Sequence, residues 1–597
     1  MRSHSDTHSR SHRGAPPSVL DVLVVGAGPV GLTAAAELRR RGVTVRIVDR
    51  LPARLPYAKA VGVQPRTLEI WERMGCVRAA LEAAVPLRGQ FVYVDGVERA
   101  RTDLVLPAEV PYRFAALPQY ETERILAETL ARFGTRVERV TELVGFTQDA
   151  DGVTARLVRA VAGGTPAEEE VRCRYLVGCD GAHSAVRKGL GLAFEGGAFP
   201  SAYMLGDVRL DWDVTPGYSV RASRTDRPGG AADRTGGSSP GAGGGETLVA
   251  VPLPGGRYRV SMNVPSGGPD EPAGPPERGG RADEGTEGAD GVTHGLEHGG
   301  RKPWLSDLQG VLDRLSPWPV TASDLRWSSV FRISHRLVDR YGEGRVFVAG
   351  DAAHIHPPTG AQGMNTGIQD AYNLAWKLAL AVEGRAAPGL LASYDAERHP
   401  VGQEVVGRTV RHAVQGMEAD PADPETLMLR EAQLLLGYRG SPVVGGAGPS
   451  ADGEGPGPRA GDRVPDCTGL THPLVAAPLR LHELLRDRGH VLLLHPEGDG
   501  PAAAGELRRL ADRAAELSGG AVETCVVLPG AAPEEVSIAV AAVGLAVYRD
   551  AAGGFARGFA VPTPTAFLVR PDGYLGARFD PADRAALDAC LRGVFAP

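Results

Sequence analysis

Three glycines near the start of the chain have the spacing of a loop that binds phosphate groups. Gly26, Gly28 and Gly31 follow the apolar run 21–25, which predicts a buried parallel strand, and residues 32–41 have the composition of a helix. Glycines at this spacing allow a tight turn and a close approach of a pyrophosphate, and the N-terminus of the helix directs N–H groups toward it. The pattern therefore predicts a dinucleotide site.

A carboxylate follows at the position where such a site binds a ribose. Asp49 comes directly after the predicted second strand, 44–48, at the distance along the chain from Gly26 that suits an acid on the ribose hydroxyls. This unit alone leaves FAD and NAD(P) as alternatives. The competing interpretation is a glycine-rich turn that binds nothing.

Two further turns place an aspartate beside a glycine at the end of a predicted strand. Asp180 and Gly181 form the first, and Gly350 and Asp351 form the second, which opens through a loop rich in proline and glycine into a long helix. An aspartate at a strand end can be a simple turn residue. Its repetition in two strand–turn–helix units of one chain favours a ligand site.

Together these three motifs resemble the single-component FAD-dependent aromatic hydroxylases of the para-hydroxybenzoate and phenol hydroxylase type, over about residues 20–400. The resemblance is strongest to polyketide-tailoring and rifampicin-type monooxygenases, which carry a thioredoxin-like C-terminal domain. It implies an α/β protein with a Rossmann-like FAD-binding domain, an inserted mixed β-sheet substrate domain and a C-terminal thioredoxin-like domain.

The resemblance assigns site residues by position. The expected FAD-binding residues are Gly26, Gly28, Gly31, Asp49, Arg50, Lys59, Gln119, Asp180, Gly181, Gly350, Asp351, Gly360, Gly363, Met364 and Asn365. The expected catalytic groups are backbone atoms at the flavin ring, from Pro357, Gly363, Met364 and Asn365, which would stabilise negative charge on the reduced ring.

One position departs from the family pattern. Lys59 stands where many members have arginine, so the positive charge is kept but the planar stacking surface is lost. Arg66 is a candidate to compensate for this loss.

The implied activity is hydroxylation of an aromatic substrate, phenolic or derived from a polyketide, by bound FAD with NADPH or NADH and O2 through a C4a-hydroperoxyflavin. A single glycine-rich unit favours transient docking of the nicotinamide. Few charges on the substrate-domain strands favour a mostly apolar aromatic, and Trp327, Val330 and Phe331 either line its pocket or belong to the sheet core. The alternatives are epoxidation, Baeyer–Villiger oxidation or antibiotic inactivation on the same scaffold, or a flavin-bound protein that sequesters a ligand without turnover.

Composition and motif order, together with the resemblance, give the expected domain organisation. It comprises a disordered tail (1–18), the FAD-binding domain (19–200 and 325–400), the substrate domain (201–324) with Gly/Pro-rich insertions (224–245 and 265–303), connecting helices (401–437), a linker (438–461) and the thioredoxin-like domain (462–597). The last domain lacks a Cys-x-x-Cys pair, which indicates a structural or homodimer-forming role rather than dithiol exchange.

The overall composition excludes several classes of protein. A net charge of −7 gives no field that attracts nucleic acid, and no apolar run is long enough to span a membrane. Six scattered cysteines without a zinc pattern favour the cytoplasm. His354 and His356 form a pair without a third ligand nearby, so no metal is expected.

Overall fold

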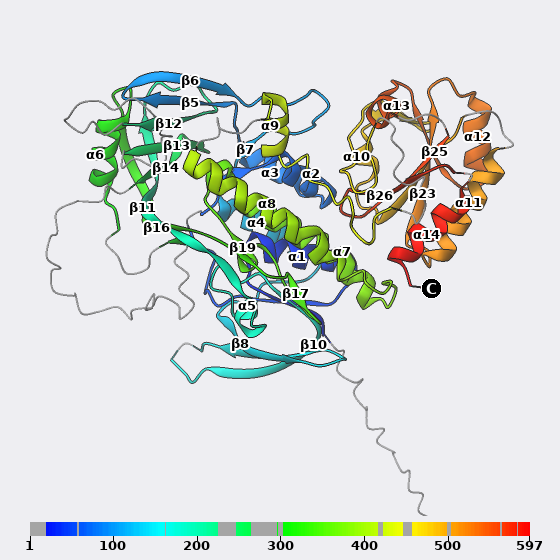
Figure 1. Cartoon of the computed structure of the whole chain (residues 1–597), viewed down its shortest axis with the longest axis horizontal. Coiled ribbons are helices and arrows are strands. Elements are labelled where there is room, and N and C mark those ends of the chain that lie inside the picture. The colour runs from blue at the N-terminus through cyan, green and yellow to red at the C-terminus, as the bar shows by residue number, and fades with distance from the viewer. Residues whose placement is uncertain are drawn as a thin grey trace, which may run out of the picture.

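The computed structural model describes most of the chain (Figure 1). The described residues are 20–56, 59–161, 163–224, 246–263, 295–296, 302–415, 422–445, 457–497, 503–560, 564–581 and 583–596. The predicted tail and nearly all of the two Gly/Pro-rich insertions lie outside these residues. Within them, the strands form sheets of seven, nine, seven and three strands.

The first seven-stranded sheet contains the glycine-rich unit. Its central order is β17-β18-β10-β1-β2, in which β1 is parallel to β2 and β10, and β10 is parallel to β18. The antiparallel strands β9 and β8 extend from β10. The strands are β1 Leu20–Val25, β2 Val45–Val48, β8 Thr141–Gln148, β9 Val153–Arg159, β10 Ala167–Gly178, β17 Gly342–Glu343 and β18 Val346–Val348.

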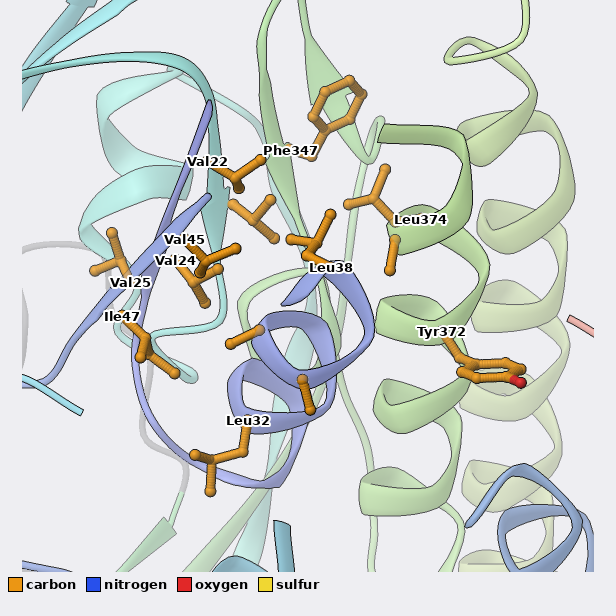
Figure 2. Packing of buried hydrophobic residues seen from close by; sticks show 14 of the residues in the cluster. Val22, Val24, Val25, Leu32, Leu38, Val45, Ile47, Phe347, Tyr372 and Leu374 are labelled. Carbon is orange, nitrogen blue, oxygen red and sulfur yellow. The ribbon is translucent and has the colours of Figure 1, made fainter. Parts of the chain in front are cut away.

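Apolar side chains fix two helices against this sheet (Figure 2). Strand β1 is an almost uninterrupted run of buried valine and leucine, as expected for a parallel strand covered on both faces. Helix α1, Pro29–Arg40, lies between this sheet and helix α7, Gly363–Val382, with Leu32 and Leu38 in the same core as Leu374. The start of α7 is thereby held beside the end of β18. The other helices around this core are α2 Pro65–Arg73, α3 Val77–Ala83, α4 Gln119–Ala131 and α5 Ala185–Gly189.

The nine-stranded sheet is the expected substrate sheet, with the order β15-β16-β11-β14-β13-β12-β5-β6 and β19 paired to β16. Helix α6, Leu305–Leu315, covers its outer face (Figure 1). The strands are β5 Gly89–Val94, β6 Val97–Asp103, β11 Phe194–Asp211, β12 Tyr218–Ser223, β13 Thr247–Leu253, β14 Arg257–Asn263, β15 Gly295–Leu296, β16 Thr321–Val338 and β19 His354–Ile355. The fourth sheet has three short strands, in the order β3 Gly62–Val63, β7 Ala115–Ala116 and β4 Val85–Pro86.

Three predicted domain limits differ from this arrangement. Strands β5 and β6 belong to the nine-stranded sheet although their residues fall within the predicted FAD-binding range 19–200, because β5 pairs in parallel with the distant strand β12. Strand β16 runs through the predicted boundary between residues 324 and 325. Helix α8, Ser393–Gln415, likewise crosses the predicted boundary at residue 400, with Pro400 inside the helix.

The C-terminal part has its own seven-stranded sheet, in the order β21-β20-β24-β23-β22-β25-β26. Strands β22, β23 and β24 are parallel, and β25 and β26 form an antiparallel hairpin beside β22. The strands are β20 Leu470–His472, β21 Val475–Leu479, β22 His490–His495, β23 Val522–Pro529, β24 Ala546–Asp550, β25 Thr565–Val569 and β26 Leu575–Phe579. Its helices are α10 Leu481–Leu484, α11 Ala503–Leu517, α12 Glu534–Ala542, α13 Gly554–Phe559 and α14 Arg584–Val594. Helix α9, Pro424–Glu431, precedes this part and packs with Leu106 and Val110 instead. No described helix combines the length and the apolarity needed to cross a membrane.

Candidate functional site

The three predicted motifs meet at one edge of the first sheet. The last residues of three parallel strands are in register, with Val25 opposite Gly178 and Gly178 opposite Val348. The amide of Cys179 donates to the carbonyl of Val25 at 2.7 Å, and the amide of Ala349 donates to Gly178 at 2.9 Å. The turns after these strands therefore lie side by side, at the edge where open parallel sheets bind ligands.

The glycine-rich turn has the shape of a phosphate cradle. Gly26 has a positive φ of 95°, and a Cβ on it would clash with the carbonyl of Cys179. A Cβ on Gly31 would clash with the carbonyl of Gly26, whereas a Cβ on Gly28 would meet no atom within 4 Å. Packing thus requires Gly26 and Gly31, while Gly28 faces open space at the N-terminus of α1, where the first N–H groups have no partner within the helix.

Asp49 lies next to this turn, and its role on the ribose stays a prediction. Its carboxylate accepts hydrogen bonds from the amides of Ala27, at 2.7 Å, and Leu51, at 2.8 Å. Arg139 approaches the same carboxylate at 3.6 Å. Asp49 therefore fixes the glycine-rich turn to the end of β2, and the exposed Arg50 follows it.

Asp180 is used mainly inside its own turn. Its carboxylate accepts hydrogen bonds from the hydroxyl of Ser184, at 2.5 Å, and from the amide of Ala185, at 2.7 Å, at the start of α5. Burial raises the pKa of Asp180, although these hydrogen bonds oppose the rise. The structure thus gives Asp180 the turn-capping role that was its alternative, and its contact with FAD stays a prediction. Gly181 has a φ of 83°, which favours glycine.

Asp351 lies at the third turn and is open to solvent. Gly350 has a φ of 62°, and its amide donates to Oδ2 of Asp370 at 3.1 Å. The Asp351 side chain is exposed, yet protein groups surround it closely enough that desolvation raises its pKa, against the charges of Lys59 and His354. An accessible carboxyl group in such crowded surroundings suits a residue that binds a ligand inside the protein.

Gln119 and Lys59 belong to one local arrangement. Oε1 of Gln119 accepts hydrogen bonds from the amides of Lys59, at 3.2 Å, and Ala60, at 3.1 Å. Gln119 therefore fixes the loop that carries the exposed Lys59 side chain. Tyr57 and Ala58, before it, lie outside the described residues.

Arg66 does not compensate for Lys59, which corrects that expectation. Its guanidinium is buried and donates to Glu69 at 2.9 Å and to the carbonyl of Asp572, in the C-terminal part, at 2.7 Å. It also lies 4.9 Å from the ring centroid of Tyr574. Arg66 thus belongs to the seam between the first sheet's helices and the C-terminal part.

The loop before α7 is held in an unusual backbone conformation. Gly360 has a φ of 71° and Ala361, which has a side chain, has a φ of 54°. The buried side chain of Asn365 accepts from the amide of Gln64 at 3.0 Å and donates to the carbonyls of Gly62, at 3.0 Å, and Ala361, at 2.7 Å. The side chain of Asn365 therefore holds the loop in place. Only the backbone amide of Asn365 is left to bind a ligand.

The other residues predicted around the flavin ring start α7. Pro357 is buried, and Gly363 and Met364 are half-buried. The amides of the first helical residues have no acceptor within a helix, so they are available to a negatively charged group. The structure therefore gathers Pro357, Gly360, Gly363, Met364 and Asn365 in one loop and helix start.

Sequence reasoning missed a set of amide side chains that clamp this loop. Gln362 donates to Oε2 of Glu431 at 2.9 Å, and Gln433 donates to Oε1 of Gln362 at 2.7 Å. Gln433 has a φ of 59°. Gln64 donates to the carbonyl of Gly360 at 2.6 Å. No spacing rule links these residues in the sequence. In the structure, the positive φ angles of Ala361 and Gln433 mark the place, because backbone strain tends to occur at functional sites.

No cluster of potential metal ligands occurs among the described residues, and the two histidines of the loop, His354 and His356, have other surroundings. His354 Nε2 lies 2.8 Å from Asp370 Oδ2. Burial lowers the pKa of His356 to about 4, so this imidazole is neutral at neutral pH.

The nine-stranded sheet has two different faces. Alternate residues such as Val208 and Val260 are fully buried under α6. On the other face, register pairs place Trp327 beside Asp207 and Phe331 beside Tyr203. This second face is toward α4, because burial and the nearby charge of Asp207 raise the pKa of Tyr120, on α4.

The aromatic residues proposed for the pocket separate accordingly. Phe331 and Trp327 lie on the second face, and Trp327 donates through Nε1 to Oδ2 of Asp207 at 2.8 Å. Val330 pairs with Met204, which packs with the α6 core. Val330 therefore lies on the core side of the sheet, and the pocket role of Trp327 and Phe331 stays a prediction.

These features define a nucleotide-cofactor-binding α/β protein with a second, mixed sheet. The chain belongs to the FAD binding domain family, whose pattern matches residues 19–225 and 299–409. The open space at Gly28 and the accessible Asp351 agree with FAD at this edge. The family confirms the predicted FAD cofactor and the mixed α/β fold.

Several monooxygenases are similar to this chain over nearly its whole length. The chain is 33% identical to 6-methylpretetramide 4-monooxygenase from Streptomyces rimosus over 96% of its own length and 93% of the relative. It is 30% identical to pentachlorophenol 4-monooxygenase from Sphingobium chlorophenolicum, with 93% of each chain covered. A solved structure of aklavinone-11 hydroxylase with FAD and aklavinone superimposes with a TM-score of 0.69 at 25% identity, over 96% of this chain and 98% of that one. These relatives confirm the prediction of an FAD-dependent monooxygenase of aromatic compounds.

Proposed function

We propose that this monooxygenase hydroxylates a polycyclic phenol, with FAD bound along the three turns. The substrate would lie on the second face of the nine-stranded sheet, the face opposite α6, which is called the open face below. The observation that carries the proposal is the meeting of the Gly26, Asp180 and Gly350 turns at one sheet edge. The similarity to monooxygenases of phenolic compounds supports it.

The residues of this chain would divide the work of holding FAD. Gly26, Gly28 and Gly31 would take the pyrophosphate, Asp49 the adenosine ribose, and Asp351 the hydroxyls between flavin and phosphate. The amides at the start of α7 would face the flavin ring and stabilise negative charge there. When bound and reduced by NADPH or NADH, FAD supplies the activation of O2, and the protein orients the substrate and excludes water.

One charged side chain on the open face narrows the substrate class. Arg221 and Val249 are register partners, and Ser261 and Leu205 continue the same row across the sheet. Arg221 is half-buried and has no ion-pair partner in the described part of the chain. Burial raises the pKa of the nearby Tyr203, and the charge of Arg221 opposes that rise. An arginine in a row whose other members are uncharged suits a large aromatic substrate that carries one phenolate or carboxylate.

The test is substrate-stimulated consumption of NADPH or NADH and of O2, with mass spectrometry of the products. A panel of chlorophenols and polycyclic phenols should contain a compound that accelerates NAD(P)H oxidation and gains one oxygen atom. An FAD-loaded protein whose NAD(P)H oxidation no compound accelerates would favour the ligand-sequestering alternative. A product with oxygen inserted into a ring, rather than a new hydroxyl group, would favour Baeyer–Villiger chemistry.

The Arg221→Leu variant should discriminate between substrates with and without an acidic group. We expect KM for an acidic phenol to rise about 10-fold, because a charge-assisted hydrogen bond is lost, while FAD affinity stays unchanged. A matched Arg326→Leu variant, at a residue already bonded to Tyr120, should leave the preference for acidic substrates as it is. Equal changes for acidic and neutral substrates would contradict the assigned role.

We also propose that the C-terminal part is a thioredoxin-like domain without dithiol chemistry. The parallel β22–α11–β23 unit followed by the antiparallel β25–β26 hairpin and α14 supports this. Burial raises the pKa of Cys467 and of Cys590 to about 12, which disfavours reactive thiolates. Six unpaired cysteines favour a cytoplasmic location, and light scattering would test the expected homodimer.

A further inference from the structure

A chain of buried polar contacts starts at the third turn of the FAD site. The amide of Gly350 donates to Oδ2 of Asp370 at 3.1 Å, and Nε of Arg398 donates to Oδ1 of the same carboxylate at 2.7 Å. Arg398 also donates through Nη2 to the carbonyl of Thr366, in the first turns of α7, at 3.2 Å. The side chains of Asp370 and Arg398 are fully buried. One arginine therefore ties together the two backbone segments that face the proposed flavin position.

The same arginine reaches toward the C-terminal part. Nη1 of Arg398 donates to the hydroxyl of Tyr438 at 3.1 Å. The ring of Tyr438 lies 4.2 Å, centroid to centroid, from the ring of Tyr574, in the turn between β25 and β26. The backbone continues the contact, since the amide of Tyr438 donates to Gly461, whose own amide donates to Leu575, each at 2.7 Å.

The turn 570–574 is itself inserted between α7 and α8. Arg570 donates two hydrogen bonds to the carboxylate of Glu397, on α8, at 2.7 and 2.8 Å. Asp572 accepts from Nε1 of Trp376, on α7, at 3.1 Å. These groups are buried and charged, so their positions are tightly specified: a displaced member would leave an unpaired charge away from water.

We propose that Asp370 and Arg398 are positioning residues through which the 570–574 turn of the C-terminal part fixes the Gly350–Asp351 turn and the start of α7 for FAD. The inference rests on the assignment of FAD to this edge in the proposed function. It gives the C-terminal part a role in cofactor binding that needs none of its own thiols. Because binding linkage is reciprocal, FAD must in turn stabilise the distant hairpin.

The test is amide hydrogen exchange of the full-length protein with and without FAD, together with FAD titration. In the wild type, FAD should slow exchange in residues 565–579. Exchange in α12 should stay unchanged, because this helix takes no part in the contacts that run from Asp370 through Arg398 and Tyr438 to Tyr574. The Tyr438→Phe variant removes only the hydroxyl that accepts from Arg398. It should bind FAD about 5- to 10-fold more weakly and lose the FAD-dependent slowing in residues 565–579.

The matched control is Tyr341→Phe, which removes another fully buried hydroxyl, one without a hydrogen-bond partner in the described structure. It should change neither readout. Wild-type protein that binds FAD without slowing exchange in residues 565–579 would overturn the inference and leave the proposed function standing, and so would unchanged FAD affinity in Tyr438→Phe. Wild-type protein that binds no FAD would overturn the proposed function and the inference with it. If Tyr438→Phe does not fold, the wild-type exchange result alone decides.

Discussion

The Gly28→Val variant is expected to fold like the wild type and to bind FAD at least about 100-fold more weakly, a loss of roughly 2.8 kcal/mol. Gly28 has an ordinary φ of −75°, and a Cβ there would meet no protein atom within 4 Å. The added side chain would instead occupy the space where the pyrophosphate must approach the backbone. Quenching of flavin fluorescence on titration measures the affinity, and circular dichroism with thermal unfolding measures the fold.

The neighbouring Gly26→Val variant provides the contrast. Its φ of 95° and the clash with the carbonyl of Cys179 predict lower stability as well as lost FAD. Only Gly28→Val should therefore separate cofactor binding from folding. Unchanged FAD affinity in Gly28→Val would mean that the open space at this turn is not the pyrophosphate site.

The sequence was sufficient to locate the cofactor edge. Each of the three turns is marked by local signals, an apolar strand followed by glycine or Asp-Gly and then a helix, and parallel strands bring their carboxyl ends to the same edge. The structure places the turns at Gly26, Asp180 and Gly350 side by side, as these signals require.

The remaining features depend on contacts between distant segments, which local patterns do not contain. Strand β5 joins the substrate sheet by pairing with β12, more than a hundred residues later in the chain. Arg66 looked available to a ligand because nothing near it in sequence shows that Asp572 covers it. The strained backbone of Ala361 is likewise supported by Asn365 and by residues of the distant 431–433 segment. An aspartate at the end of a strand also does not reveal its hydrogen-bond partner. Asp49 accepts from Ala27, in the distant glycine-rich turn, whereas Asp180 accepts from Ser184 and Ala185, in its own turn.

The largest effect on stability is expected at Glu397, which joins the two parts of the chain. Its carboxylate accepts from Arg570 and from Nζ of Lys377, at 2.8 Å, and all three side chains are fully buried. The Glu397→Gln variant would leave Lys377 without its ion-pair partner and Arg570 paired with Asp572 alone. We therefore expect it to lower the free energy of unfolding by about 3–5 kcal/mol at pH 7. The exposed pair Arg340–Glu343 supplies the control, and Glu343→Gln should cost less than about 1 kcal/mol.

The pH dependence of this loss tests its electrostatic origin. Burial alone would raise the pKa of Glu397, but Arg570 and Lys377 outweigh it and hold the pKa well below its usual range. A carboxyl group with a depressed pKa stabilises the fold above its unfolded-state pKa, about 4.3, and loses that contribution as the pH falls toward the folded-state value. The difference in thermal midpoint between wild type and Glu397→Gln should therefore narrow below about pH 4. A difference that does not change with pH would mean that lost packing, rather than lost charge, destabilises the variant.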